Sequence, residues 1–203
     1  MLRHPGKTAL LVAVTIILSY SFGCILSPEE EVRPDPRPPA NFAPLTAPDS
    51  LIYNLVLAYG ELHIEEYSKL LLRTDDGDYG QEYYWYNQIE DVENLGEESY
   101  PREADITRTG NLFQAAKTVP VKPEHPIIDS YVFKINPGTW APEDSLWGEP
   151  CEDCWVTERG YYIKISVGED SITGDDRVRF YVVPIQVGDV TEYRIAVAKD
   201  VFY

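Results

Sequence analysis

Positive charge is scarce in this chain of 203 residues, which has 17 Lys and Arg against 34 Asp and Glu. Two of the basic residues, Arg3 and Lys7, lie near the N-terminus, so the remainder of the chain is even more acidic. A formal net charge of −17 repels nucleic-acid phosphates and anionic lipid headgroups. We therefore expect no nucleic-acid partner, and any membrane attachment must come from a covalent lipid.

Long apolar runs and catalytic motifs are also missing. No run approaches the roughly 20 apolar residues that a membrane-spanning helix needs. There is no glycine-rich phosphate loop and no Ser-His-Asp arrangement in its usual context, so nucleotide use and hydrolysis are unsupported, and we expect no cofactor. The 44% hydrophobic content is that of one ordinary globular domain, and 15 tyrosines suit strands and pocket walls.

The N-terminus has the three zones of a secretory signal peptide. Basic residues at positions 3 to 7 precede the apolar run 9–18, and small residues follow directly before Cys24. A cysteine after Gly23 resembles the lipobox of bacterial lipoproteins, which implies cleavage after residue 23 and acylation of Cys24. The alternative is a cut nearby that releases a soluble exported protein and leaves Cys24 incidental.

The lipobox resemblance also implies a cellular location. Ile25 rather than Asp follows Cys24, which by similarity to enterobacterial lipoproteins favours a lipid anchor in the outer membrane of the cell envelope. Residues 24–45 are dense in proline and predict an extended tether. We expect the domain itself to occupy residues 46–203.

Apolar spacing predicts helices first and strands afterwards. Positions 51–62 and 64–71 have helical periodicity, as does the stretch after Pro101 up to residue 116. Thr46 and Asp49 have the spacing of a capping box for the first helix. This order predicts an α+β domain.

Strands are predicted at 82–86 and, by period-two alternation, at 130–135, 161–167, 178–182 and 193–197. Loops with the sequences NPG, GED, TGDD and VGD separate these later runs. The late strands should therefore form an antiparallel meander.

The segment 51–71, LIYNLVLAYGELHIEEYSKLL, resembles the first two helices of SnoaL-like domains in the nuclear-transport-factor-2-like superfamily. The segment 104–116 is similar to that family's third helix. The resemblance implies a cone-shaped domain whose N-terminal helices pack on a curved antiparallel sheet around a pocket, and domains of this shape often pair as homodimers. The family often has Asn or Asp around Leu62 and His63, and its Asp-His dyad does not align here, so no catalytic residue is assigned.

Two groups of residues are candidates for sites. Tyr59, His63, Tyr67 and Tyr131 are candidate pocket residues, with His63 as an alternative general base. Cys151 and Cys154 predict a structural disulfide, because Glu152 and Asp153 between them disfavour the thiolate of a redox pair. Half a zinc site is the weaker alternative, since a second such cysteine pair is absent.

Two functions remain open on the sequence. The favoured one is non-catalytic binding of a small apolar ligand or an envelope protein, which predicts an aromatic pocket without a buried ionisable group. The rival is an isomerase, cyclase or dehydratase of the SnoaL-like kind acting on a small apolar substrate. That chemistry requires a histidine or carboxylate with a perturbed pKa inside the cone.

Overall fold

The computed structural model describes residues 41–88, 92–93, 96–117 and 128–201. The chain divides into two units, Met1–Pro39 and Ala40–Tyr203, and every described residue belongs to the second unit. The predicted signal peptide, Cys24 and the tether up to residue 40 lie outside the described residues. Within the described residues, no helix has the length and apolar character needed to cross a membrane.

The three helices that the periodicity predicts are present: α2 (Pro48–Gly60), α3 (Ile64–Leu70) and α5 (Arg102–Ala116). Two short strands, Tyr84–Tyr86 and Ser99–Pro101, lie between α3 and α5 in the sequence. On α2, Leu51, Leu55 and Ala58 are buried along one face. The predicted capping box is wrong. The N-cap residue of α2 is Ala47, not Thr46, and alanine has no side chain that could cap the helix. The Asp49 carboxylate accepts hydrogen bonds from Trp140 and Arg159.

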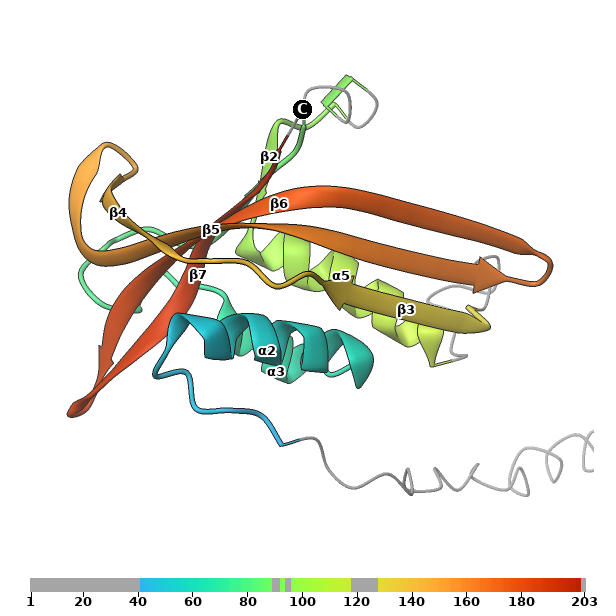
Figure 1. Cartoon of the computed structure of the whole chain (residues 1–203), viewed down its shortest axis with the longest axis horizontal. Helices are drawn as coiled ribbons and strands as arrows, with labels where there is room; N and C mark the ends of the chain where they lie inside the picture. Colours follow the sequence, from blue (N-terminus) through green and yellow to red (C-terminus); the bar gives the residue numbers. More distant parts are fainter. Residues whose placement is uncertain (1–40, 89–91, 94–95, 118–127, 202–203) are drawn as a thin grey trace, which may run out of the picture. The chain divides into compact units, whose positions relative to one another are not determined.

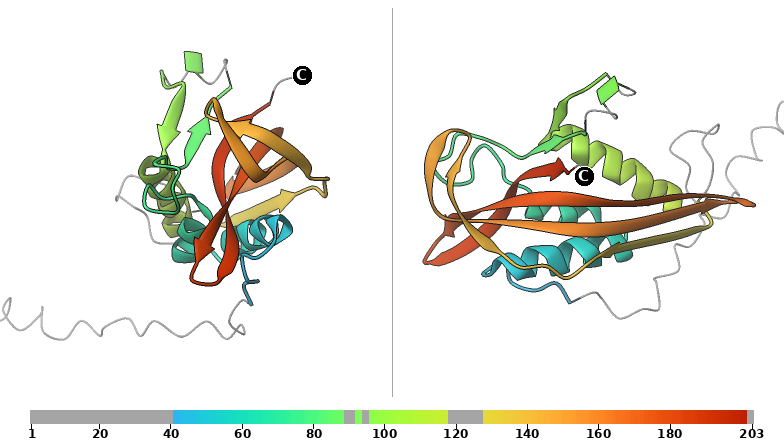
Figure 2. Two further views of the ribbon diagram at one scale, coloured as in Figure 1. Left: turned by 90° about the vertical axis from the view of Figure 1, so that its left-hand side faces the viewer. Right: turned by 45° about the horizontal axis from the view of Figure 1, so that its top comes forward.

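The strands form one seven-stranded sheet in the order β2-β1-β7-β6-β5-β3, with β4 also paired to β5 (Figure 1). Their bounds are β1 Tyr84–Tyr86, β2 Ser99–Pro101, β3 Ser130–Ile135, β4 Ala141–Leu146, β5 Glu149–Val167, β6 Asp170–Val187 and β7 Val190–Asp200. The sheet is strongly curved and the helices cover one of its faces (Figure 2). The predicted fold class, α+β with N-terminal helices on a curved sheet, is confirmed.

One pairing departs from the predicted antiparallel sheet. Strand β1 runs parallel to β7, with Tyr84 opposite Val197 and Tyr86 opposite Lys199. The two strands lie far apart in the sequence, so no hairpin fixes their relative direction. The sheet is therefore mixed at this edge.

Three of the four predicted loops are confirmed, since the NPG segment lies between β3 and β4, and one is wrong. Tight two-residue turns join β5 to β6 and β6 to β7, and Gly168 and Gly188 supply their positive φ angles of 59° and 61°. The TGDD segment, however, lies inside β6, where Thr173 pairs with Lys164 and Asp176 with Tyr161. Because the turn at Gly168 fixes the register, pairing continues through residues that would otherwise favour a loop.

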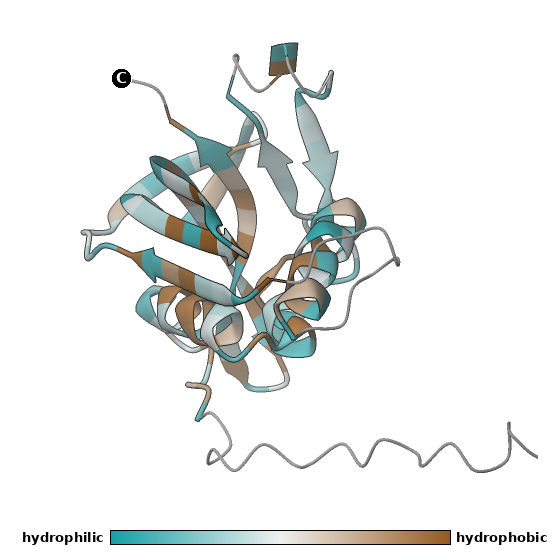
Figure 3. Ribbon diagram, turned by 90° about the vertical axis from the view of Figure 1, so that its right-hand side faces the viewer, coloured by the Kyte–Doolittle hydropathy of each residue, from teal (hydrophilic) through white to brown (hydrophobic). Residues whose placement is uncertain are grey.

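The core lies between the helices and the sheet. Four successive residues of β7, Ile195 to Ala198, are buried, so both faces of that strand are covered. Figure 3 shows alternating apolar and polar bands along the strands, in keeping with the period of two. Phe42 and Leu45, from the segment expected to be a tether, also pack against this core.

Candidate functional site

A cavity of about 150 Å³ lies between the helices and the sheet. Its walls come from all three helical segments and from the sheet, and are made by Leu55, Tyr59, Tyr67, Leu71, Tyr83, Trp85, Leu112, Phe133, Ile135, Tyr161, Ile163, Val178, Phe180 and Ile195. No acidic, basic or histidine side chain is among the described residues that line it. The cavity surface is therefore apolar and aromatic, apart from tyrosine hydroxyl and tryptophan N–H groups.

Tyr59, near the end of α2, is the centre of an aromatic cluster at this cavity. Its ring stacks on Phe133 with centroids 4.2 Å apart and on Tyr131 at 6.4 Å. It meets Tyr67 and Phe113 edge to face, at 5.5 and 5.1 Å. Such contacts restrict ring rotation and add to the energy of burial, so the walls of the cavity are well defined.

The tyrosine hydroxyl groups at the cavity have partners on α5. The Tyr67 hydroxyl donates to Asp105 Oδ2 over 2.5 Å, and the Tyr59 hydroxyl lies 3.4 Å from Thr109 Oγ1. The hydroxyl of Tyr131 is different, because it is buried without a hydrogen-bond partner among the described residues.

Asp105 is a buried carboxylate, with 5% of its surface exposed. Burial raises the pKa of Asp105 above its ordinary value, while hydrogen bonds from Tyr67 and Tyr83 and the charge of Arg108 act in the opposite direction. Burial also raises the pKa of Tyr67 and of Tyr83 well above the ordinary range, and the Asp105 charge adds to both increases. Asp105 is not part of the cavity lining, but two of the lining tyrosines contact it.

Sequence reasoning missed Asp105. The apolar periodicity of this helix runs through Ile106, Gly110, Phe113 and Ala116, whereas its buried residues are Asp105, Thr109 and Phe113. Their spacing of four residues was a usable signal, since it puts all three on one helical face. The apolar pattern does not include Asp105, because burying a carboxylate is costly unless it is hydrogen-bonded, and its tyrosine partner lies 38 positions away in the sequence.

The four tyrosine and histidine candidates are only partly brought together. Tyr59 and Tyr67 line the cavity, and Tyr131 stacks on Tyr59 from outside the lining. His63 does not line the cavity. It precedes α3, where its Nδ1 accepts the backbone N–H of Glu66 at 3.4 Å, and its ring lies against Phe42 at 5.7 Å.

The two late cysteines lie in β5. Cys151 and Cys154 are joined by a disulfide, and their α-carbons are 5.7 Å apart. Cys154 is buried in the core and neither cysteine lines the cavity. Across the described residues, no group of three His, Cys, Asp or Glu side chains is arranged to hold a metal ion.

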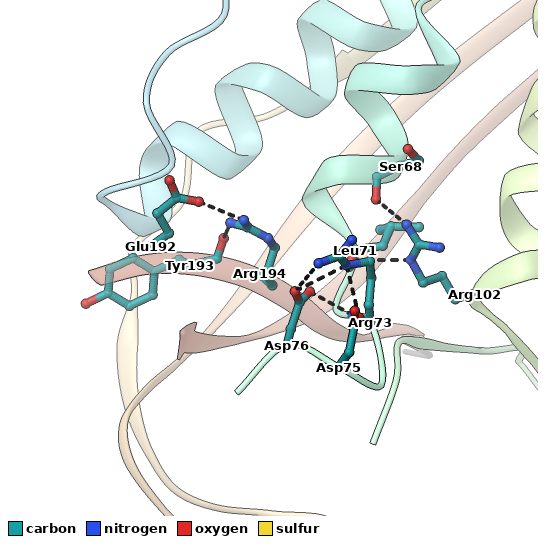
Figure 4. A network of polar contacts seen from close by, with 9 residues as sticks. All are labelled: Ser68, Leu71, Arg73, Asp75, Asp76, Arg102, Glu192, Tyr193 and Arg194. Atoms are coloured by element: carbon teal, nitrogen blue, oxygen red, sulfur yellow. Dashed lines mark hydrogen bonds and ion pairs between the residues drawn. The ribbon is translucent and has the colours of Figure 1, made fainter. Parts of the chain in front are cut away.

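A polar region separate from the cavity joins α3 to β7 and α5 (Figure 4). Its pocket of about 210 Å³ is lined by Ser68, Lys69, Leu71, Arg73, Asp76, Arg102 and Arg194. Arg73 pairs with Asp76 at 3.0 Å and Arg194 with Glu192 at 2.7 Å. Arg102 donates to the Ser68 carbonyl at 2.7 Å, and burial together with nearby Arg73 lowers its pKa.

Each of these three arginines is thus satisfied by an acceptor within the protein. Carboxylates pair with Arg73 and Arg194, and carbonyl oxygens at the end of α3 accept hydrogen bonds from Arg102, so these contacts link α3 to its neighbours. We assign these contacts a structural role.

Comparison with known proteins gives two structural similarities. No family model matches the chain and no curated protein matches it. The β subunit of benzoate 1,2-dioxygenase from Burkholderia mallei is 11% identical, over 76% of this chain and 87% of its own, with a TM-score of 0.47. A candidate dehydratase of the NTF2-like family from Streptomyces avermitilis is 11% identical, over 77% of this chain and 100% of its own, with a TM-score of 0.43.

The second of these proteins is named for the superfamily that the sequence resembles. At 11% identity and with TM-scores below 0.5, neither similarity assigns a function to this chain. The functional argument therefore rests on the residues of the cavity.

Proposed function

We propose that the chain is an exported lipoprotein whose domain binds a small apolar molecule of about one ring in size, without transforming it. The observation that carries this proposal is the cavity between helices and sheet, whose described lining holds no charged or histidine side chain. An apolar cavity of about 150 Å³ admits a benzene-sized molecule. Larger ligands would require the aromatic walls to move.

Binding rather than catalysis is favoured by the position of Asp105. A general base must reach the proton that it removes, and Asp105 lies behind the lining instead of in it. Its carboxylate accepts a hydrogen bond from Tyr67, so it holds that ring in one orientation. Asp105 is in this view a positioning residue for the wall of the pocket.

The binding proposal is tested by thermal unfolding of the full chain with benzene, toluene, indole and naphthalene. A ligand at tenfold its Kd should stabilise the fold by about 1.4 kcal/mol, which raises the Tm by a few degrees. Leu112→Trp, which fills the cavity from α5, should abolish the shift. Ile172→Trp adds the same ring at a side chain that is 70% exposed and should preserve it. An equal rise in Tm in both variants would contradict the proposal, and so would the absence of a rise with all four ligands.

A second candidate function, SnoaL-like acid–base chemistry on a small apolar substrate, is favoured by the raised pKa of Asp105. A substrate proton would pass to the Tyr67 oxygen while the Tyr67 hydroxyl proton moves to Asp105. Asp105→Asn separates the two functions. If the natural chain turns a substrate over and Asp105→Asn binds it without turnover, the enzyme is supported. If both proteins bind equally well and neither shows turnover, the binding function is supported.

The anchor is a separate part of the proposal and is tested separately. Cells expressing the full chain are fed an alkyne-tagged fatty acid, and the label on the protein is detected after gel separation. We expect label on the natural chain and none on Cys24→Ala. Equal labelling of the two would show that Cys24 is not the acylated residue.

A further inference from the structure

Outside the cavity, an open groove of about 580 Å³ lies between α2 and β3. Ile52, Val56 and Leu57 of α2 form one side and Phe133 and Ile135 of β3 form the other. The last two residues also line the cavity, so they separate the two spaces. The groove is mainly apolar, yet it contains one arginine.

That arginine, Arg159, is buried on β5, with only 7% of its surface exposed. Its Nε donates to Thr157 Oγ1 at 3.2 Å, and one Nη2 hydrogen is directed at Asp49 Oδ1 at 3.3 Å. The Trp140 ring lies 5.3 Å from its guanidinium carbon. Arg159 is among the described residues that line the groove, and its only carboxylate partner among the described residues is Asp49.

The counter-ion of Arg159 is a weak one. The Asp49 side chain is 78% exposed, so solvent screens its attraction for the guanidinium. Its Oδ1 also accepts the Trp140 indole N–H at 2.7 Å. A buried cation is costly unless it is well paired, and the one carboxylate that pairs with Arg159 among the described residues is exposed and lies 3.3 Å away.

We infer that the groove binds an organic carboxylate with an apolar tail, whose carboxylate group pairs with Arg159. The flat guanidinium matches the two oxygens of a carboxylate, and the aliphatic and aromatic side chains beyond it accept the tail. This site is distinct from the cavity of the proposed function and does not depend on it.

The charge of the whole protein selects among anions. A net charge of −17 opposes the approach of phosphate esters, which carry nearly two negative charges. A monocarboxylate brings a single charge, and burial of its tail provides a favourable term that is independent of charge. Asp49 competes with the ligand for Arg159, and the ligand replaces it on binding.

The test is titration calorimetry of the full chain with sodium octanoate, with 1-octanol as the uncharged probe. Octanoate should bind at least about tenfold more tightly than octanol, as expected for a charge-assisted hydrogen bond. Arg159→Met should lose that preference and Arg159→Lys should keep part of it. Arg177→Met removes an arginine of β6 that pairs with Glu158. Arg177 lies opposite Gly160, so its side chain is on the other face of the sheet from Arg159, and this variant should bind like the natural chain.

Asp49→Asn provides a second, independent measurement, because it removes the competing carboxylate without removing the arginine. Octanoate should then bind several-fold more tightly. Binding should also change the fluorescence of Trp140, and this change should be absent in Trp140→Phe. If Arg159→Met fails to fold, as judged by circular dichroism, the response of Asp49→Asn decides.

Several results would overturn the inference. They are equal affinity for octanol and octanoate, equal binding by the Arg159→Met and Arg177→Met variants, and weaker or unchanged binding by Asp49→Asn. Absence of octanoate binding at millimolar concentration also overturns it. Loss of octanoate binding in the cavity-filling Leu112→Trp, with binding retained in Arg159→Met, would place the ligand in the cavity instead.

Discussion

The carboxyl group of Asp105 lies among tyrosines whose rings form part of the cavity wall. The Tyr67 hydroxyl donates to it, and hydrogen bonding from Tyr67 and Tyr83 favours its ionised form, while burial disfavours that form more strongly. A buried carboxylate costs stability when it is charged. Its position next to the cavity is explained if it fixes the orientation of the tyrosines that line the proposed ligand site.

This position makes stability depend on pH in a defined direction. The folded protein holds the Asp105 proton more tightly than the unfolded chain does, so its contribution to stability is full below the unfolded-chain pKa of about 4. That contribution is lost as the pH rises through the higher folded pKa. The free energy of unfolding of the natural chain should therefore fall relative to Asp105→Asn across this window.

Urea denaturation of both proteins between pH 3.5 and 8 measures the difference. Asp144→Asn removes an exposed carboxylate from β4 and controls for the loss of one negative charge. A difference between the natural chain and Asp105→Asn that does not change with pH would show that Asp105 is not destabilised by its charge in the folded state.

At the scale of single elements, α2 contributes to three parts of the structure. One face is buried in the core, its end carries Tyr59 to the cavity, and its outer face forms a side of the groove. Asn54 of α2 also holds the segment before the helix. Its side-chain amide accepts the backbone N–H of Ala43 and donates to the Ala43 carbonyl, both at 2.8 Å. This pair of bonds fixes the segment that precedes the helix.

Asn54→Ala should therefore lower the free energy of unfolding by about 1–3 kcal/mol, since Asn54 is 3% exposed and two hydrogen bonds are lost. The chain near residue 43 should also become sensitive to protease before the rest of the domain unfolds. Denaturant titration and mass spectrometry of a brief digest check the two parts. Asn111→Ala, at an exposed position of α5, should change neither the free energy of unfolding nor the cleavage near residue 43. Early cleavage near residue 43 in Asn111→Ala but not in Asn54→Ala would contradict the role given to Asn54.

At the scale of the whole molecule, the fold places four tyrosines in the wall of one cavity. Burial raises the pKa of Tyr59, Tyr67 and Tyr83 above the ordinary value. The unfolded chain loses these protons first as the pH rises above about 10, so the folded state loses stability in alkali. The buried hydroxyl groups should thus ionise only as the domain unfolds.

Absorbance at 295 nm and far-UV circular dichroism, recorded together from pH 8 to 13, test this expectation. A cooperative rise in tyrosinate should coincide with the loss of circular dichroism, and Tyr59→Phe should reduce its amplitude. Gradual ionisation of all tyrosines while the circular dichroism stays constant would show that solvent reaches the cluster in the folded protein.

The fold was largely accessible from sequence because its elements have strong local periods. Spacing of three and four residues gave α2 and α3, and alternation gave β3 and one part of each of β5, β6 and β7. Strands β2 and β4 were missed because they are short and polar, with Pro142 in β4. β2 is stabilised by pairing with β1, and β4 by pairing with β5. Pairing of this kind cannot be recognised from the residues of one strand alone.

The amino-acid sequence by itself therefore determined the layer order, the two tight turns at Gly168 and Gly188, and the acidity that governs possible partners. Only the tertiary structure decided which polar residues become buried. Asp105 meets a tyrosine 38 positions away and Arg159 meets an aspartate 110 positions away. Burial of a charge is set by such distant partners, whereas periodicity reports only which side of an element faces inward.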